Sequence, residues 1–224
     1  MDNYIDLSPK TLFPSGASIA YESILPFPHP WGAIPFIREI IKSLIVELDP
    51  AEYIITERGS MISREASVQD SAYIGEGCIV MSGAEIRHSA YLRSDALIGR
   101  CCVVGNSTEI KNSILFDGAK APHFNYVGDS ILGEGAHLGA GVIISNLKSD
   151  KTPVRVNTGA DFIDTGLKKF GAIIGDGAEI GCGSVLNPGT VIGRGASIYP
   201  LSSVRGYVPE NHIYKSRDNI TKRL

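Results

Sequence analysis

The sequence contains no long apolar run and no basic tract. No window of about 18 residues is both uncharged and apolar, so we expect no membrane-spanning helix. The formal net charge is −3 and no Lys/Arg-rich segment occurs, which argues against a nucleic-acid-binding protein. The first ten residues contain no basic stretch followed by an apolar core, so we do not expect secretion and predict a cytoplasmic protein.

Cysteine motifs typical of metal or redox sites are absent as well. The four cysteines form no CxxC pair and have no spacing typical of metal ligands, and the histidines at 88, 123 and 137 do not follow a zinc-binding pattern. We therefore predict no metal site and a reducing compartment. Glycine, in contrast, is abundant, with 25 residues among 224. Without low complexity, this excess indicates many regularly spaced turns.

Aliphatic residues recur at every sixth position. The repeat runs unbroken from Ile62 to Ile110, resumes at Leu132, and returns from Ile174 to Val204. A helix would repeat every 3.6 residues, an ordinary strand every 2, and a β-sandwich would place its short strands every 8–12. Hexads are typical of a parallel β-helix, in which three short strands form one triangular coil. The sequence predicts this all-β fold, with the aliphatic residues pointing inward and an interruption between Ile110 and Leu132.

The N-terminal part lies outside the repeat. Residues 1–60 carry several prolines and are predicted to form a strap that ends in a helix, about Ile34 to Leu48, with an apolar face. We expect this helix to cap the open N-terminal end of the prism, where core and strand edges would otherwise be exposed.

The β-helix itself is assigned to residues 61–208, with an excursion at 147–171. Short apolar segments on either side of residues 157–160 predict a protruding hairpin within this excursion. The tail at 209–224 is polar and is expected to pack on the last coil or on a neighbouring molecule.

The six-residue repeat predicts that two basic side chains lie close together. Arg93 and Lys111 each follow an inward aliphatic residue and are 18 positions apart, which is one coil. They are therefore expected to stack in adjacent strands, about 4.8 Å apart. One interpretation is a clamp for a phosphate; the other is two solvated side chains balanced by Asp95 or Glu109.

The interruption carries a second set of candidates, in the stretch APHFNYVGD at 121–129. Histidine is the residue type whose unperturbed pKa lies near neutrality, so His123 suits the role of a general base. Asn125 and Tyr126 could orient a ligand beside it. The alternative is a surface histidine in a turn.

Four segments carry a resemblance to a known family: LRSDALIG, VGNSTEIKNS, APHFNYVGDS and LGAGVIISN, between residues 92 and 146. The chain resembles the acetyltransferase domain of the bifunctional N-acetylglucosamine-1-phosphate uridyltransferase/glucosamine-1-phosphate acetyltransferase. It is more similar still to the β-helix half of archaeal sugar-1-phosphate nucleotidylyltransferases that also acetylate amino sugars. The resemblance extends over about residues 60–215 and implies a left-handed β-helix and a homotrimer with sites between subunits.

The resemblance also implies roles for individual residues. His123 matches the catalytic base, and Asn146 matches an asparagine that binds the amino sugar near the acetyl donor. Positions that match substrate-binding residues are Arg93, Lys111, Tyr126 and, in place of an asparagine, His137. Positions that match the acetyl-CoA site are Ala140 and, in place of a serine and an alanine, Cys182 and Pro200. Leu147 stands where the bacterial enzyme has a tyrosine.

The expected activity is therefore acetyl-CoA-dependent N-acetylation of an amino-sugar 1-phosphate, with no metal required. The alternative is a non-catalytic sugar-nucleotide-binding or accessory protein, which the altered acetyl-CoA positions favour. A nucleotidyltransferase activity is not expected, because no Gly-rich phosphate loop is present and residues 1–60 are too few for an α/β nucleotide-binding domain.

Overall fold

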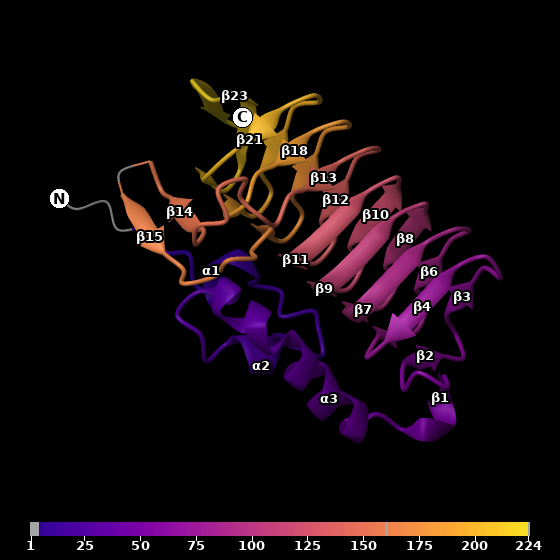
Figure 1. Ribbon diagram of the computed structural model, residues 1–224. Coiled ribbons are helices and arrows are strands. Elements are labelled where there is room, and N and C mark those ends of the chain that lie inside the picture. Colours follow the sequence, from indigo (N-terminus) through magenta and orange to yellow (C-terminus); the bar gives the residue numbers. More distant parts are fainter. Residues whose placement is uncertain (1–4, 160, 224) are drawn as a thin grey trace.

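The computed structural model describes residues 5–159 and 161–223, in which the repeat forms a parallel β-solenoid with three sides (Figure 1). Each coil gives one short strand to each side, and each strand pairs with the strand of the next coil. Three long strands turn the corner between two sides without a break: β7 (Tyr91–Ile98), β9 (Glu109–Leu115) and β11 (Tyr126–Leu132).

We name the three sides by what lies outside them. The open face consists of β4 (Tyr73–Glu76), the first halves of β7, β9 and β11, β13 (Ile143–Ile144), β18 (Val185–Leu186) and β21 (Ser203–Val204). The covered face consists of β2 (Met61–Ser63), β5 (Ile79–Val80), the second halves of the three long strands, β16 (Ala172–Ile174), β19 (Thr190–Ile192) and β22 (Tyr207–Val208).

The third face consists of β3 (Ser67–Val68), β6 (Glu85–Ile86), β8 (Val103–Asn106), β10 (Lys120–His123), β12 (His137–Leu138), β17 (Glu179–Ile180), β20 (Ser197–Ile198) and β23 (His212–Ser216). The inward side chains of all three faces form one core along the axis, with Val104, Ile110 and Ile192 fully buried. The inward register predicted from the hexads is confirmed.

The predicted interruption between Ile110 and Leu132 was wrong. The inward positions continue as Leu115, Ala121 and Val127, so two steps have five residues in place of six. The strands pair through this region without a gap, with Ile110 opposite Val127 and Leu115 opposite Leu132. A coil of 17 residues still closes the triangle, because one side is one residue shorter. The departure in sequence phase is therefore a shortened coil and no break in the solenoid.

The N-terminal segment lies along one side of the solenoid. Its elements are α1 (Pro9–Leu12), α2 (Tyr21–Ile24), the 3₁₀ helix η1 (Pro30–Phe36), α3 (Ile37–Glu47) and the 3₁₀ turn η2 (Pro50–Glu52), followed by β1 (Tyr53–Ile55), which pairs antiparallel with β2. In Figure 1 these helices lie beneath the strands, and the segment crosses several coils in the direction of the solenoid axis. The expectation of a helix across the N-terminal end is thus corrected: the helix is present, but it covers a face.

Outward aliphatic residues explain this position. The covered face presents Leu97, Ile114 and Ile131 on successive coils, and all three are fully buried against the N-terminal segment. Ile37 and Ile41 of α3 belong to the same buried cluster. A second core therefore lies outside the prism, and burying it is the main favourable contribution to holding the segment in place.

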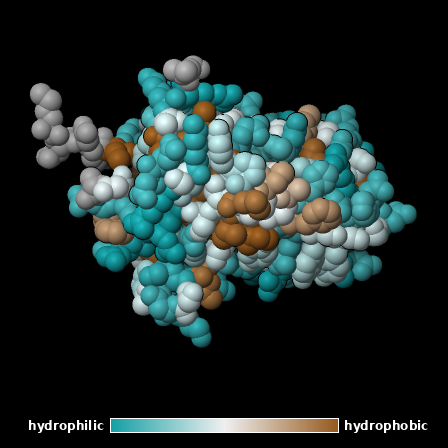
Figure 2. Space-filling model, turned by 90° about the horizontal axis from the view of Figure 1, so that it is seen from above, coloured by the Kyte–Doolittle hydropathy of each residue, from teal (hydrophilic) through white to brown (hydrophobic). Residues whose placement is uncertain are grey.

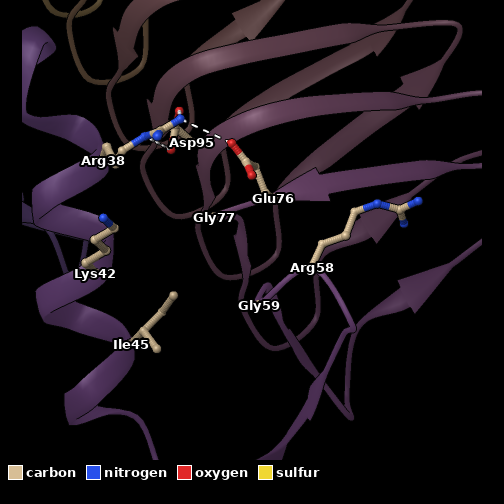
Figure 3. Close-up of a pocket in the computed structure, with 8 residues that line it drawn as sticks. All are labelled: Arg38, Lys42, Ile45, Arg58, Gly59, Glu76, Gly77 and Asp95. Carbon is tan, nitrogen blue, oxygen red and sulfur yellow. Dashed lines mark hydrogen bonds and ion pairs between the residues drawn. The ribbon is translucent and has the colours of Figure 1, made fainter.

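Polar contacts fix the segment at several coils. Arg38 of α3 makes two hydrogen bonds of 3.0 Å to the carboxylate of Asp95 and lies 3.3 Å from Glu76. Figure 3 shows these three side chains at the edge of a pocket of about 270 Å³, which Lys42 and Arg58 also line. Further along, backbone bonds join Ala17 to Asp117 and Leu12 to Asp176.

The excursion contains the predicted hairpin, and the coils before and after the excursion pair directly with each other. Strands β14 (Arg155–Asn157) and β15 (Phe162–Asp164) pair antiparallel, while residue 160 of the predicted turn lies outside the described residues. On either side of the excursion, Ile144 pairs with Leu186 as in any other coil. The tail packs on the last coil, where β23 pairs with β20 and with β24 (Asn219–Lys222).

The surface seen from above Figure 1 is largely hydrophilic, with a compact hydrophobic patch near its middle (Figure 2). Within residues 5–159 and 161–223, no helix is long and apolar enough to cross a membrane.

Candidate functional site

Apart from His137 and Tyr126, the candidate residues lie at or next to the two corners that border the open face. The corner between the third face and the open face carries His123, Ala140, Cys182 and Pro200, and we call it the His123 corner. The corner between the open face and the covered face carries Lys111, Asp129 and Asn146, and we call it the Asp129 corner. Tyr126 lies on the open face between the two corners.

Backbone hydrogen bonds stack the His123 corner coil by coil. The amide of Gly141 donates to the carbonyl of His123, that of Gly183 to Ala140, and that of Leu201 to Cys182, at 2.8 to 2.9 Å. The four predicted residues therefore form one line along the edge of the solenoid, with a spacing of about 4.8 Å per coil. The side chains of His123, Cys182 and Pro200 are exposed along this line.

The ring of His123 is oriented by the preceding coil. Its Nδ1 lies 3.4 Å from Oδ1 of Asn106, and the two residues are paired in β8 and β10. The amide oxygen of an asparagine only accepts, so this contact favours a proton on Nδ1 and a free lone pair on Nε2. That is the tautomer that a general base requires.

The structure gives Asn125 a different position from the one predicted. Its side chain is buried, it accepts from the backbone amide of His123 at 3.1 Å, and it donates to the carbonyl of Gly139 at 2.8 Å. With its polar atoms bonded to backbone, Asn125 holds the turn that presents His123, and a direct contact with substrate is not supported by this geometry.

His137 is not brought together with the other candidates. It points outward from β12 on the third face, where Nδ1 lies 2.7 Å from a carboxylate oxygen of Glu179. Leu147 lies beyond the Asp129 corner and is 42% exposed.

A buried carboxylate organises the Asp129 corner. The side chain of Asp129 is 4% exposed and accepts from Nζ of Lys111 at 3.2 and 3.3 Å and from Nδ2 of Asn112 at 2.7 Å. Nδ2 of Asn146 donates to the same carboxylate. The backbone of Asp129 is left-handed, with φ of 50°, which turns the chain at the corner and directs the carboxylate toward these donors.

Gly128 brings the tyrosine and the asparagine together. A Cβ atom at this position would lie 2.7 Å from Oη of Tyr126 and 2.9 Å from Nδ2 of Asn146, so only glycine leaves room for both. Burial, and next the charges of Glu109 and Asp129, raise the pKa of Tyr126, while a hydrogen bond from Asn146 acts in the opposite direction. The phenol is therefore neutral at physiological pH and keeps a proton to donate.

The predicted stacking of Arg93 on Lys111 is corrected by the register. A bulge between Leu92 and Ser94 places Ser94 opposite Lys111 and leaves Arg93 unpaired in the ladder. Arg93 lies 3.3 Å from Glu109, while Lys111 contacts Asp129. Each cation thus has its own carboxylate, and Asp95, the other expected partner, binds Arg38.

Sequence reasoning assigned no role to Asn106, Asn112 or Asp129. Their contacts join neighbouring coils, at separations of 17 or 18 residues. The signal available was the coil length itself: once two steps have five residues, these three side chains fall beside His123 and Lys111.

Two family models match the chain. Residues 74–160 match the GMPPB C-terminal domain, and residues 171–206 match the bacterial transferase hexapeptide (six repeats). The first range contains both corners as far as Asn146, and the second contains Cys182 and Pro200. The strap and the helices that cover one face precede both ranges.

Curated relatives are similar over about half of the chain. The bifunctional sugar-1-phosphate nucleotidylyltransferase/acetyltransferase of Sulfurisphaera tokodaii is 39% identical over 103 residues, which are 46% of this chain and 26% of that protein. The bifunctional protein GlmU of Methanococcus aeolicus is 34% identical over 111 residues, 49% of this chain and 27% of that protein. The chain thus spans about a quarter of the length of these relatives.

Among solved structures, the acetyltransferase domain of PglB from Neisseria gonorrhoeae, in complex with acetyl coenzyme A, is 17% identical. The match covers 85% of this chain and 67% of that one, with a TM-score of 0.34. Similarity at this level says nothing about activity.

Proposed function

Because the chain is a hexapeptide-repeat protein homologous to part of these bifunctional enzymes, we propose that it is an acetyl-CoA-dependent N-acetyltransferase. The proposed acceptor is an amino-sugar 1-phosphate. The observation that carries the proposal is the single line formed by His123, Ala140, Cys182 and Pro200. It sets an oriented imidazole at one end of an exposed edge along which an extended cofactor can lie.

The chemistry needs few groups. The amine of the sugar attacks the thioester carbonyl, the C–S bond breaks and the amide C–N bond forms. Nε2 of His123 accepts the proton that the amine loses and returns it to the departing thiolate, so no covalent enzyme intermediate is required. A backbone N–H near Ala140 stabilises the oxyanion of the tetrahedral intermediate. None of these steps uses a metal.

One chain alone does not bring the two corners together. His123 ends β10 and Gly128 lies in β11, so the two residues stand at opposite ends of the open face. An amine held at Asn146 would have to reach His123 across the width of this face. We propose that a homotrimer places the His123 corner of one chain against the Asp129 corner of the next. Exposed apolar side chains on the open face support such a contact: Tyr73, Tyr91, Ile143 and Val185.

The phosphate is best assigned to Arg93. Its guanidinium is half exposed and pairs with the partly exposed carboxylate of Glu109, an interaction that contributes little to stability and is readily exchanged. Lys111 is only 18% exposed and is held by Asp129, so its release would leave a buried carboxylate unpaired.

The test is release of free thiol from acetyl-CoA by the purified protein with glucosamine-1-phosphate and, separately, galactosamine-1-phosphate. We expect His123→Ala to lower kcat by roughly 10²–10⁴-fold. His88→Ala provides the matched control, because His88 is an exposed histidine on the same edge, one coil before Asn106. Residual activity above about a tenth of the wild-type value would exclude His123 as the base.

A mixing experiment tests the shared site. His123→Ala and Asn146→Ala chains are each expected to keep only a small, measurable residual activity, but co-refolded equal mixtures should regain roughly a quarter of the wild-type sites if each site uses two chains. No recovery in correctly assembled mixtures would contradict the shared site. Absence of thiol release by a folded wild-type protein would favour the non-catalytic alternative, to be examined by binding of sugar nucleotides.

A further inference from the structure

The Asp129 carboxylate is surrounded by donors rather than by solvent. Lys111, Asn112 and Asn146 each donate to it, and only 4% of its side chain is exposed. A carboxylate has about four acceptor positions, so this one is nearly saturated within the chain. It has no room for a direct contact with a substrate.

The same carboxylate fixes which way the amide of Asn146 points. An ionised carboxylate only accepts, so the group of Asn146 that faces it must be the NH₂ group. The same NH₂ group lies near the hydroxyl of Tyr126, because a Cβ atom at Gly128 would contact both Nδ2 of Asn146 and Oη of Tyr126. In the described residues no donor meets Oδ1 of Asn146, which therefore remains an acceptor. The site then offers an acceptor on Asn146 and a donor on Tyr126.

We infer that Asp129 is a positioning residue that sets the hydrogen-bonding direction of Asn146, so that Oδ1 of Asn146 accepts from the N–H of the acceptor amine. The inference rests on the proposed function, which supplies the amine. If the side-chain amide of Asn146 were free to flip, its NH₂ group would face the substrate as often as its oxygen does. In the flipped state a hydrogen of Asn146 would face a hydrogen of the amine, and no hydrogen bond could form. Asp129 removes that second state and also balances the charge of Lys111.

Asp129→Asn tests the inference with little change in shape. Asparagine tolerates the left-handed backbone at this position, with φ of 50°, and keeps the size of the side chain. It can face Asn146 with either atom, so the orientation is lost. We expect KM for the amine to rise on the order of tenfold, the effect of about one hydrogen bond, with KM for acetyl-CoA unchanged. An unchanged KM for the amine would overturn the inference.

A double-mutant cycle separates positioning from general damage. If Asp129 acts through Asn146, then Asp129→Asn should lower kcat/KM less than about threefold when Asn146→Ala is already present. An undiminished tenfold loss on that background would contradict the inference. Should Asp129→Asn fail to fold because Lys111 is left unpaired, Lys111→Met/Asp129→Asn removes the buried cation as well. Compared with Lys111→Met alone, it tests the same rise in KM.

Asp95→Asn is the matched control. Asp95 has the same left-handed backbone, with φ of 51°, and is also buried, but its partner is Arg38 and it contacts no candidate site residue. We expect this variant to lose stability without a change in KM for the amine. The two levels of failure stay distinct, because a folded wild-type protein without thiol release removes the proposed function itself. An active wild-type protein with an unaffected Asp129→Asn variant removes only the role of Asp129.

Discussion

The open face and the covered face are made by the same three strands and differ in what they present outward. The first halves of β7, β9 and β11 direct Tyr91, Glu109 and Tyr126 to the outside, whereas their second halves direct Leu97, Ile114 and Ile131 there. The aliphatic half is covered by the N-terminal segment, and the polar and aromatic half is left uncovered. Both groups of candidate residues border the uncovered half.

The difference shows that an outward position in a solenoid is not by itself a surface position. Ile114 is as fully buried as the inward Ile110. On three adjacent coils of the covered face an aliphatic residue (Leu97, Ile114 or Ile131) stands directly before the inward one, whereas the open face has Tyr91, Glu109 and Tyr126 at the corresponding positions. Such an unbroken outward row of aliphatic residues calls for a partner segment. Three sets of substitutions test this contrast, and their expected effects decrease in the order given.

The largest effect is expected from a charge on the covered face. Ile114→Asp buries an unpaired carboxylate between the solenoid and the N-terminal segment and should lower the free energy of unfolding by more than about 3 kcal/mol. Ile143→Asp makes the same change on the open face, where the side chain is 38% exposed in a single chain. It should lower the free energy of unfolding of the chain by about 1 kcal/mol or less, with its larger effect on assembly of the proposed trimer. Urea unfolding followed by circular dichroism measures both. Equal losses would mean that the faces do not differ as described.

A smaller effect separates the two cations of the open face. Arg93→Ala should raise KM for a phosphorylated amino sugar about tenfold or more, because a charge-assisted contact is lost, and should leave KM for the unphosphorylated sugar unchanged. Lys111→Met should affect both sugars alike, because its ammonium is bound to Asp129. Arg38→Ala, a cation on the covered side, provides the control and should change neither KM. A phosphate-specific effect of Lys111→Met would reverse the assignment.

The smallest effect concerns two tyrosines on opposite faces. Burial is the main cause that raises the pKa of both Tyr126, on the open face, and Tyr207, on the covered face, from the ordinary value of 10.0. Because the folded pKa is the higher one, the stability that each phenol contributes is complete below pH 10 and is lost as the pH rises through the folded value. Absorbance titrations of Tyr126→Phe and Tyr207→Phe should each lose a late-ionising phenol. Binding of a sugar phosphate should raise the pH at which Tyr126 ionises and should leave that of Tyr207 unchanged.

The hexads predict the inward register and the face on which each strand lies, because one residue of each hexad points into the core and this residue is aliphatic. They do not predict the five-residue steps after Ile110 and Val127, since a shortened corner changes no residue type and only displaces the phase. The place of α3 was predictable in principle. Pairs such as Leu97-Ile98 and Ile114-Leu115 place a second aliphatic residue outside the prism at the same side of successive coils.

The candidate site is predictable only in part. His123 and Tyr126 are recognisable from chemistry and resemblance, and the structure places them at and beside an exposed corner. Asp129 is not recognisable, because its meaning depends on donors in the coils before and after it. Asn125 shows the converse: a polar residue beside a candidate base is a reasonable ligand in sequence, but in the fold its amide holds the turn.

The N-terminal segment also changes how the solenoid is expected to unfold. In an array of repeats each unit touches only its neighbours, so stability is a sum of local terms and the ends can fray independently. Here one segment contacts Asp95, Asp117 and Asp176, which belong to different coils along the axis. Coils that do not touch one another are therefore coupled through a common partner. Unfolding should then be a single cooperative transition across this stretch, and detachment of the segment should convert it into a gradual one.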